Sequence, residues 1–252
     1  RDGQWQQALL LLGELRMSRL EAGVISHNAA ISACEKGMQW QLALSLFGGL
    51  KHSNCILSLI SYTAGITSCA RGWQWSNGLS LLRELKGSQM KADVVTYNAT
   101  ISACERGGQW QLALMLLGEL ASSDLAPDTV SYNAAITACE RAGQWMQALV
   151  LLDELHAREL QPAALSFGVV LRACAKGGRW RHALALLGRL RLAELDPGSD
   201  GYGDAIVACE RDGPWQQALL LLGELRRCRL EPTVVGYNSS ISACARGGQW
   251  RP

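Results

Sequence analysis

The sequence contains few aromatic residues and no hydrophobic run long enough to cross a membrane. Two Phe, five Tyr and nine Trp occur among its 252 residues. A membrane-spanning helix needs about 20 consecutive, mostly apolar residues, and no such run occurs. No signal-peptide pattern opens the chain either. Because both ends of the sequence fall inside a unit of its internal repeat, we expect it to be a piece of a longer protein.

The motifs of common enzyme sites are also missing. The sequence contains no Ser/His/Asp set, no Cys/His cluster with metal-ligand spacing, no paired-carboxylate motif and no phosphate-binding GxxxxGK[ST] loop. We therefore predict no enzymatic activity, cofactor, metal or small-molecule substrate for this segment. A catalytic domain elsewhere in the parent protein would be compatible with the sequence.

The dominant feature is a period of 35 residues. Trp recurs at this interval as Trp5, Trp40, Trp75, Trp110, Trp145, Trp180, Trp215 and Trp250. Cys recurs in the same way as Cys34, Cys69, Cys104, Cys139, Cys174, Cys209 and Cys244. A fixed period of this size indicates a repeat architecture in which each unit packs on its neighbours.

The cysteine spacing argues against disulfides. Neighbouring helices pack about 8–10 Å apart, whereas the Cα atoms of bridged cysteines lie about 4.4–6.8 Å apart. Equivalent cysteines of stacked units should therefore not bridge, and we expect small buried thiols. Free thiols are typical of proteins in reducing compartments.

Each unit predicts a helical hairpin. In the unit 94–128, residues 95–106 predict a first helix with an apolar stripe, and residues 109–121 predict a second helix with a wide apolar face. The stripe consists of Tyr97, Ile101 and Cys104, and the face of Trp110, Ala113, Leu114, Leu117 and Leu120. Gly107 and Gly108 separate the helices, and Pro127 follows the second.

This phasing places the whole chain, 1–252, in one stack of hairpins. The units are a partial repeat 1–23, the repeats 24–58, 59–93, 94–128, 129–163, 164–198 and 199–233, and a partial repeat 234–252. The last two complete repeats are degenerate, because Gly201 and Gly203 occur inside a predicted first helix. Each such Gly costs about 1 kcal/mol relative to Ala, so we expect a weak joint there.

Packing does not explain a polar position in the first helix. Asn recurs there as Asn28, Asn98, Asn133 and Asn238, and Thr63 takes the same place. Asn is a mediocre helix former, so its recurrence suggests a contact surface. The alternative is a local hydrogen bond to the start of the helix.

A basic residue also recurs near the end of every first helix. These residues are Arg1, Lys36, Arg71, Arg106, Arg141, Lys176, Arg211 and Arg246. A cation at a helix C-terminus is favourable by itself, by about 0.3–1 kcal/mol. A regular row of cations would also suit a polyanion, whose phosphates supply affinity without sequence specificity.

The unit resembles the pentatricopeptide repeat. The resemblance rests on the VVTYN opening, the Gly turn, the xxALxLL second helix and the closing xPD, and it covers the whole chain. The related tetratricopeptide repeat has a period of about 34 residues. Two departures are the Trp that opens the second helix and the Cys column of the first. The resemblance implies an all-α fold, a right-handed α-solenoid superhelix of stacked helix-turn-helix hairpins.

The resemblance further implies sequence-specific binding of single-stranded RNA, with one base per repeat read by two or three side chains. In this family the reading pair is the polar residue of the first helix and the last residue of the repeat. The pairs are Asn28 with Ser58, Thr63 with Asp93, Asn98 with Asp128, and Asn133 with Ala163, and Asn238 would be the reading residue of the last partial repeat.

Two other sets of residues are assigned in the same way. The base faces would be sandwiched by Ile25, Ile60, Val95, Val130 and Leu165. The phosphates would be contacted by Lys36, Arg71, Arg106, Arg141, Lys176, Arg211 and Arg246. The resemblance also implies a role in RNA processing, stability or translation in a mitochondrion or chloroplast. It further implies association with other RNA-processing proteins.

By the family's code, Thr with Asp favours G and Asn with Asp favours U. An ionised Asp only accepts hydrogen bonds, which agrees with bases that carry a ring N–H. We therefore expect the readout 5′-pyrimidine-G-U-pyrimidine-3′ from repeats 24–163. Gly168 with Gly198 and Gly203 with Thr233 match no code pair. The competing interpretation is a protein-interaction scaffold with a concave peptide-binding surface.

Overall fold

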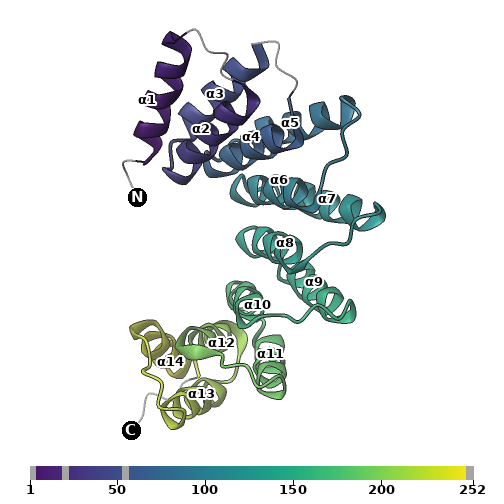
Figure 1. The fold of residues 1–252 in the computed structure, drawn as a ribbon. Coiled ribbons are helices and arrows are strands. Elements are labelled where there is room, and N and C mark those ends of the chain that lie inside the picture. The colour runs from purple at the N-terminus through teal and green to yellow at the C-terminus, as the bar shows by residue number, and fades with distance from the viewer. Residues whose placement is uncertain (1–3, 19–22, 53–56, 248–252) are drawn as a thin grey trace. The chain divides into compact units, whose positions relative to one another are not determined.

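The computed structural model describes residues 4–18, 23–52 and 57–247, and these residues form fourteen helices and no strand (Figure 1). The helices are α1 (Gln4–Met17), α2 (Val24–Lys36), α3 (Trp40–His52), α4 (Leu59–Arg71), α5 (Trp75–Gly87), α6 (Val94–Arg106), α7 (Trp110–Ser122), α8 (Thr129–Arg141), α9 (Trp145–Ala157), α10 (Ala164–Lys176), α11 (Trp180–Leu192), α12 (Gly198–Asp212), α13 (Trp215–Arg227) and α14 (Val234–Arg246). None of these helices is both long and apolar enough to span a membrane. Arg1 and Trp250 lie outside the described residues.

The helices alternate as the period predicts, with α2, α4, α6, α8, α10, α12 and α14 as first helices. Contacts between residues divide the chain into two units, 1–134 and 135–252, with the boundary inside α8. In the first unit α2 packs against α4, and α4 against α6. In the second unit α10 packs against α12, and α12 against α14. The predicted all-α repeat of stacked hairpins is confirmed.

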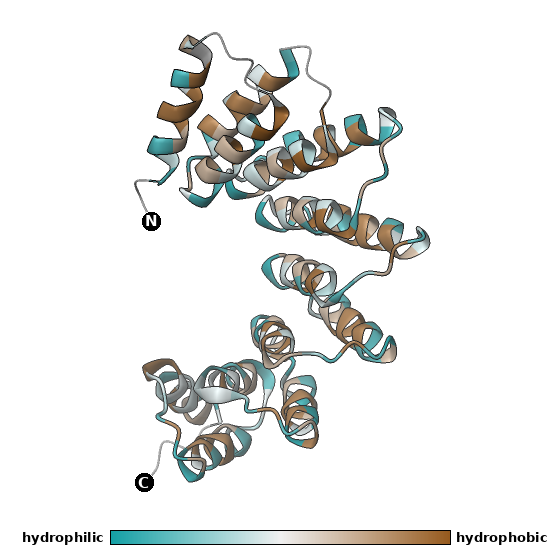
Figure 2. Cartoon of the chain, viewed as in Figure 1, coloured by the Kyte–Doolittle hydropathy of each residue, from teal (hydrophilic) through white to brown (hydrophobic). Residues whose placement is uncertain are grey.

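The apolar stripes lie where two hairpins meet. In α6, Tyr97, Ile101 and Cys104 are buried, as expected. In α7, Leu116 is buried, whereas Leu114, which we expected on the buried face, is only half-buried. Figure 2 shows hydrophobic residues along α7 and α9 and hydrophilic residues at the helix ends.

The Cys column is part of this core. Six of its members are buried, free thiols: Cys34, Cys69, Cys104, Cys139, Cys174 and Cys209. Burial raises the pKa of Cys69 to about 12 and that of Cys104 to about 11, so both thiols are neutral at physiological pH. Neutral buried thiols behave as small hydrophobic residues, which accounts for their recurrence.

One close contact between consecutive repeats joins members of the Trp column to the Gly that follows the first helix in most repeats. These glycines are Gly37, Gly72, Gly107, Gly177 and Gly247, whereas Ala142 and Asp212 take the equivalent place in two repeats. The indole of Trp75, at the start of α5, covers Gly107, which follows α6. A Cβ atom on Gly107 would lie 2.6 Å from Cγ of Trp75. Trp40 covers Gly72 in the same way. Gly107 therefore provides space for the indole, whereas Gly108, with φ of 71°, provides the left-handed backbone of the turn.

The degenerate repeat forms a helix despite its glycines. α12 begins at Gly198 and runs through Gly201 and Gly203, both of which are buried. A Cβ on Gly201 would lie 3.1 Å from Cβ of Pro197, so this glycine allows a close approach. The weak joint that we expected in this segment stays a prediction.

The contact between Gly107 and Trp75 predicts that a larger residue at position 107 destabilises the fold. Gly107→Ala should lower the free energy of unfolding by about 1–3 kcal/mol, because the indole must move away from the new methyl group. Gly118→Ala is the matched control. Gly118 is exposed within α7 and has open space around its Cα, so Ala should stabilise the helix there by about 0.5–1 kcal/mol. Urea unfolding measures both changes, and equal stability of the two variants would contradict the explanation.

Candidate functional site

The predicted reading pair Asn98 and Asp128 is brought together in the structure. Asn98 lies on α6, and Asp128 precedes α8. Asn98 Nδ2 donates a hydrogen bond of 3.0 Å to Asp128 Oδ1. Both side chains are only partly buried, so their outer edges can be reached from solvent.

Asp128 also caps the helix that follows it. The backbone N–H of Ser131 donates to Asp128 Oδ1 at 2.8 Å, so one oxygen serves the cap and the contact with Asn98 together. Burial acts to raise the pKa of Asp128, but hydrogen bonds from Ser131 and Asn98 outweigh it and hold the pKa below its ordinary value. The carboxylate is therefore ionised at neutral pH. The hydrogen bonds from Ser131 and Asn98 reach Oδ1, and the backbone of Val130 also donates to the carboxylate. A carboxylate has about four acceptor sites, so Oδ2 keeps acceptor capacity for a ligand.

Ser131 is a site residue that our sequence reasoning missed. Its buried hydroxyl donates to Asn98 Oδ1 at 2.6 Å, which orients the amide so that Nδ2 faces Asp128. A signal was present in the sequence, because a hydroxyl recurs at the third position of successive first helices. These residues are Ser26, Ser61, Thr96, Ser131 and Ser166. Such a residue three positions after a cap is typical of a reciprocal capping arrangement.

The pair Thr63 and Asp93 is connected through one of these hydroxyls. Thr63 Oγ1 on α4 lies 2.8 Å from Thr96 Oγ1 on α6. Thr96 Oγ1 in turn donates to Asp93 Oδ1 at 2.6 Å. Asp93 caps α6 through the backbone N–H of Thr96 at 2.8 Å. Asp93, which caps α6, is therefore connected through Thr96 to Thr63 on the preceding first helix.

The pair Asn28 and Ser58 makes a longer contact. Asn28 Nδ2 donates to Ser58 Oγ at 3.4 Å, and Ser58 forms a reciprocal cap with Ser61 at the start of α4. Asn28 Oδ1 is buried and has no hydrogen-bond partner among the described residues. An unsatisfied buried acceptor is costly, whereas the equivalent oxygen of Asn98 accepts a hydrogen bond from Ser131.

The remaining candidate reading residues are Asn133, Ala163 and Asn238. Asn133 on α8 is half-buried in the first unit, and Ala163, before α10, is exposed in the second. Ala163 provides no side-chain cap for α10. Asn238 is exposed on α14.

The predicted sandwiching residues all face solvent. Ile25, Ile60, Val95, Val130 and Leu165 are between 59 and 86% exposed. Val235 occupies the same position of α14 and is 59% exposed, so it belongs to this set although we did not assign it. Single exposed aliphatic residues are common on proteins, but their recurrence one position after the start of six of the seven described first helices is not explained by packing.

The basic residues at the ends of the first helices fall into two groups. Several contact the preceding repeat: Arg71 pairs with Glu35 at 3.0 Å, Lys176 with Glu140 at 2.7 Å and Arg246 with Glu210 at 4.0 Å. Arg211 Nη1 donates to the carbonyl of Lys176 at 2.5 Å. Lys36 and Arg106 are exposed and have no ion pair among the described residues. Arg141 is exposed at the end of α8.

The presence or absence of a Glu in the preceding repeat explains why some of these cations form ion pairs and others do not. Each paired cation lies 36 residues after a Glu, whereas Ala70 and Ala175 stand in the corresponding places before Arg106 and Arg211. The row therefore combines cations neutralised by cross-repeat ion pairs with cations available to a ligand. Our sequence reasoning treated the row as uniform.

Ser131 provides a test of the polar network. Ser131→Ala should lower the free energy of unfolding by about 1–3 kcal/mol, because Asn98 Oδ1 loses its donor in a buried setting. Ser122→Ala is the matched control, since its exposed hydroxyl only contacts the Glu119 carbonyl of its own helix. Urea unfolding compares the two variants, and NMR of the side-chain amide of Asn98 reports its orientation. An unchanged amide signal in Ser131→Ala would show that Ser131 does not orient Asn98.

The chain matches two models of the pentatricopeptide repeat. The PPR repeat family model matches residues 92–139 and 127–176, and the PPR repeat model matches residues 25–55 and 165–194. No curated protein matches the chain in sequence.

Solved structures with similar folds include repeat proteins that bind RNA. The crystal structure of the pentatricopeptide repeat protein PPR10 from maize is 24% identical with a TM-score of 0.68, over 95% of this chain and 34% of that one. PPR10 in complex with an 18-nt psaJ RNA element is 16% identical with a TM-score of 0.60, over 97% of this chain and 41% of that one. The chain therefore spans between a third and a half of their length.

A third structure is the PPR domain of Arabidopsis thaliana protein-only RNase P 1 in complex with tRNA. It is 16% identical with a TM-score of 0.58, over 66% of this chain and 88% of that one. At these identities the likeness shows a common fold.

Proposed function

Because this chain belongs to the pentatricopeptide repeat family, we propose that it binds single-stranded RNA and reads bases with the polar pairs of its first helices. The observation that carries the proposal is the contact of Asn98 with Asp128. Asn98 keeps a second amide hydrogen and Asp128 keeps Oδ2, so each can still contact a base edge. We propose binding without catalysis for this segment.

The reading face has the chemistry that a base needs. Val95 and Val130 are exposed aliphatic side chains one position after the starts of α6 and α8, and they would contact the two faces of a base. Asp128 is an ionised acceptor, which favours the ring N–H of U or G over A and C. By the family's code, repeats 24–163 would read pyrimidine-G-U-pyrimidine. The family's usual setting makes an organellar transcript the target that we propose, bound for its processing, stability or translation.

Base reading predicts a specific loss. Fluorescence anisotropy with short RNAs should give at least about tenfold tighter binding to CUGUC than to an oligonucleotide with AA in place of its central GU, or to the DNA version. Asn98→Ala combined with Asp128→Ala should abolish the preference at the U and leave that at the G. Asn77→Ala, which changes an exposed Asn on the second helix α5, should change neither. Equal binding to all oligonucleotides would exclude base reading.

The two groups of cations predict different salt dependences. Arg106→Ala should reduce the slope of log affinity against log salt by about 0.7, the value for one lost phosphate contact on a single strand. Arg71→Ala should change the slope less, because Glu35 already neutralises Arg71 in the free protein. Binding titrations at several salt concentrations measure both slopes. A larger effect of Arg71→Ala would contradict the assignment of Arg106 to the phosphates.

A further inference from the structure

A second recurring contact lies at the ends of the second helices. Lys86 on α5 donates to Glu119 Oε1 on α7, and Tyr97 OH on α6 donates to the same oxygen at 3.2 Å. A carboxylate thus lies between a cation and an aromatic hydroxyl. Equivalent residues make related contacts at two other places in the described chain: Lys51, Tyr62 and Glu84, and Arg191, Tyr202 and Glu224.

One repeat of the second unit lacks this built-in carboxylate. At the positions of Lys86, Tyr97 and Glu119 it has His156, Phe167 and Arg189. The guanidinium of Arg189 lies over the ring of Phe167, 5.7 Å from its centroid, and its Nη1 donates to Asp153 Oδ1 at 2.6 Å. A guanidinium carries five N–H groups, so this ion pair leaves donors on Arg189 for another acceptor.

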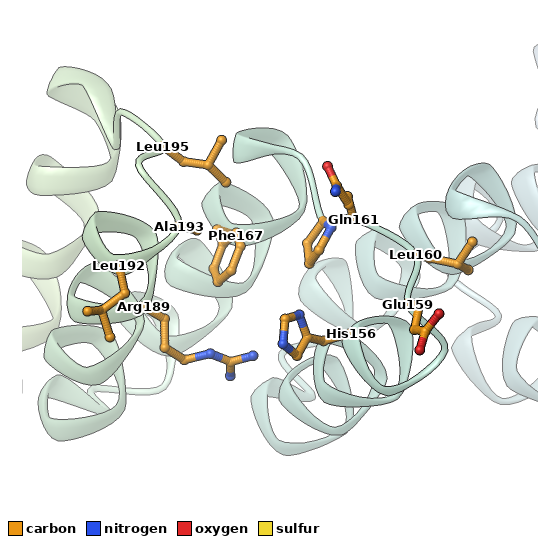
Figure 3. A pocket seen from close by; sticks show the side chains of 10 residues that line it. His156, Glu159, Leu160, Gln161, Phe167, Arg189, Leu192, Ala193 and Leu195 are labelled. Carbon is orange, nitrogen blue, oxygen red and sulfur yellow. The ribbon is translucent and has the colours of Figure 1, made fainter.

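A cavity of about 700 Å³ opens beside these residues (Figure 3). His156 and Arg189 point toward one another, and the ring of Phe167 lies beside the guanidinium of Arg189 (Figure 3). The lining also includes the apolar side chains of Leu160, Pro162, Leu192 and Leu195 and the polar side chains of Glu159 and Gln161. A cavity of this size can take several side chains.

We propose that this cavity binds a short acidic segment of a partner protein, with a Glu or Asp carboxylate placed between His156 and Arg189 and neighbouring apolar side chains against the walls. The carboxylate would take the part that Glu119 has in the first unit, where a cation and an aromatic side chain surround it. Arginine forms charge-assisted, often bidentate hydrogen bonds with carboxylates. The partner therefore supplies the group that this repeat lacks.

The lining favours a peptide over RNA. Phe167, Leu192 and Leu195 would leave a phosphate backbone against apolar walls, whereas a peptide can match them with aliphatic side chains. The cavity also uses a different part of the repeat from the candidate reading residues. Leu165 of α10 is exposed, whereas Phe167, two residues later, is buried at the cavity. Peptide and RNA could therefore bind to the chain together.

The test uses the whole chain and two labelled peptides, one of alternating leucine and glutamate and one with glutamine in place of glutamate. Anisotropy should show at least about tenfold tighter binding of the acidic peptide, because charged acceptors form the stronger hydrogen bonds with arginine. The triple variant His156→Lys, Phe167→Tyr and Arg189→Glu reproduces the residues at Lys86, Tyr97 and Glu119, although Asp153 loses its partner Arg189. The variant's affinity for the acidic peptide should be about tenfold lower, because its own carboxylate repels that of the peptide.

Arg181→Glu is the matched control, since it makes the same Arg-to-Glu replacement as at Arg189 on the exposed surface of the same helix. It should leave peptide affinity unchanged. Circular dichroism checks that every variant is folded. Absence of binding by the acidic peptide, equal binding of the two peptides, or full binding by the triple variant would each overturn the proposal. Displacement of the peptide by a short single-stranded RNA would also overturn it, in favour of a phosphate site.

Discussion

The hydrogen bonds of Asp128 are the constraint on which the reading face depends. One carboxylate oxygen caps α8 through Ser131 and also accepts from Asn98 on α6. The start of one helix and the orientation of a side chain on the preceding first helix are thereby fixed together. Asp128, which the resemblance assigns to base reading, is therefore also the cap of α8. Because the cap uses Oδ1, the position of Oδ2 is set before any ligand arrives, and such preorganisation lowers the cost of binding.

The sequence predicted the fold in detail because the period repeats each signal several times. The stripe of Tyr97, Ile101 and Cys104 is buried as expected, and α6 begins within a residue of its predicted start. The contact of Trp75 with Gly107 was not predicted. The sequence shows the recurring Trp and the Gly turn, but it does not show that the Trp of one repeat packs against the Gly of the next. The predicted apolar face included Leu114, which is half-buried, and omitted Leu116, which is buried. Both lie near the edge of that face, where spacing alone does not decide burial.

The candidate site was predicted only in part. Asn98 and Asp128 were named from the resemblance, but the hydroxyl of Ser131, which orients them, has an ordinary capping role in sequence and drew no attention. The cations were named as one row, whereas Glu35 and its equivalents neutralise some of them. That distinction depends on residues 36 positions apart, a spacing one residue longer than the period. This spacing arises because a residue of one repeat packs beside a non-equivalent residue of the next repeat.

The central claim is that each polar pair reads one base independently of the others, and replacing a single reading residue tests it most directly. Thr63→Asn gives the pair at Asp93 the composition of the pair at Asp128. Binding should be measured with RNAs that differ only at the base opposite this repeat. By the family's code, the preferred base should change from G to U while preferences at the neighbouring positions stay the same. A preference that stays at G, or that changes at several positions together, would contradict one-base reading by these pairs.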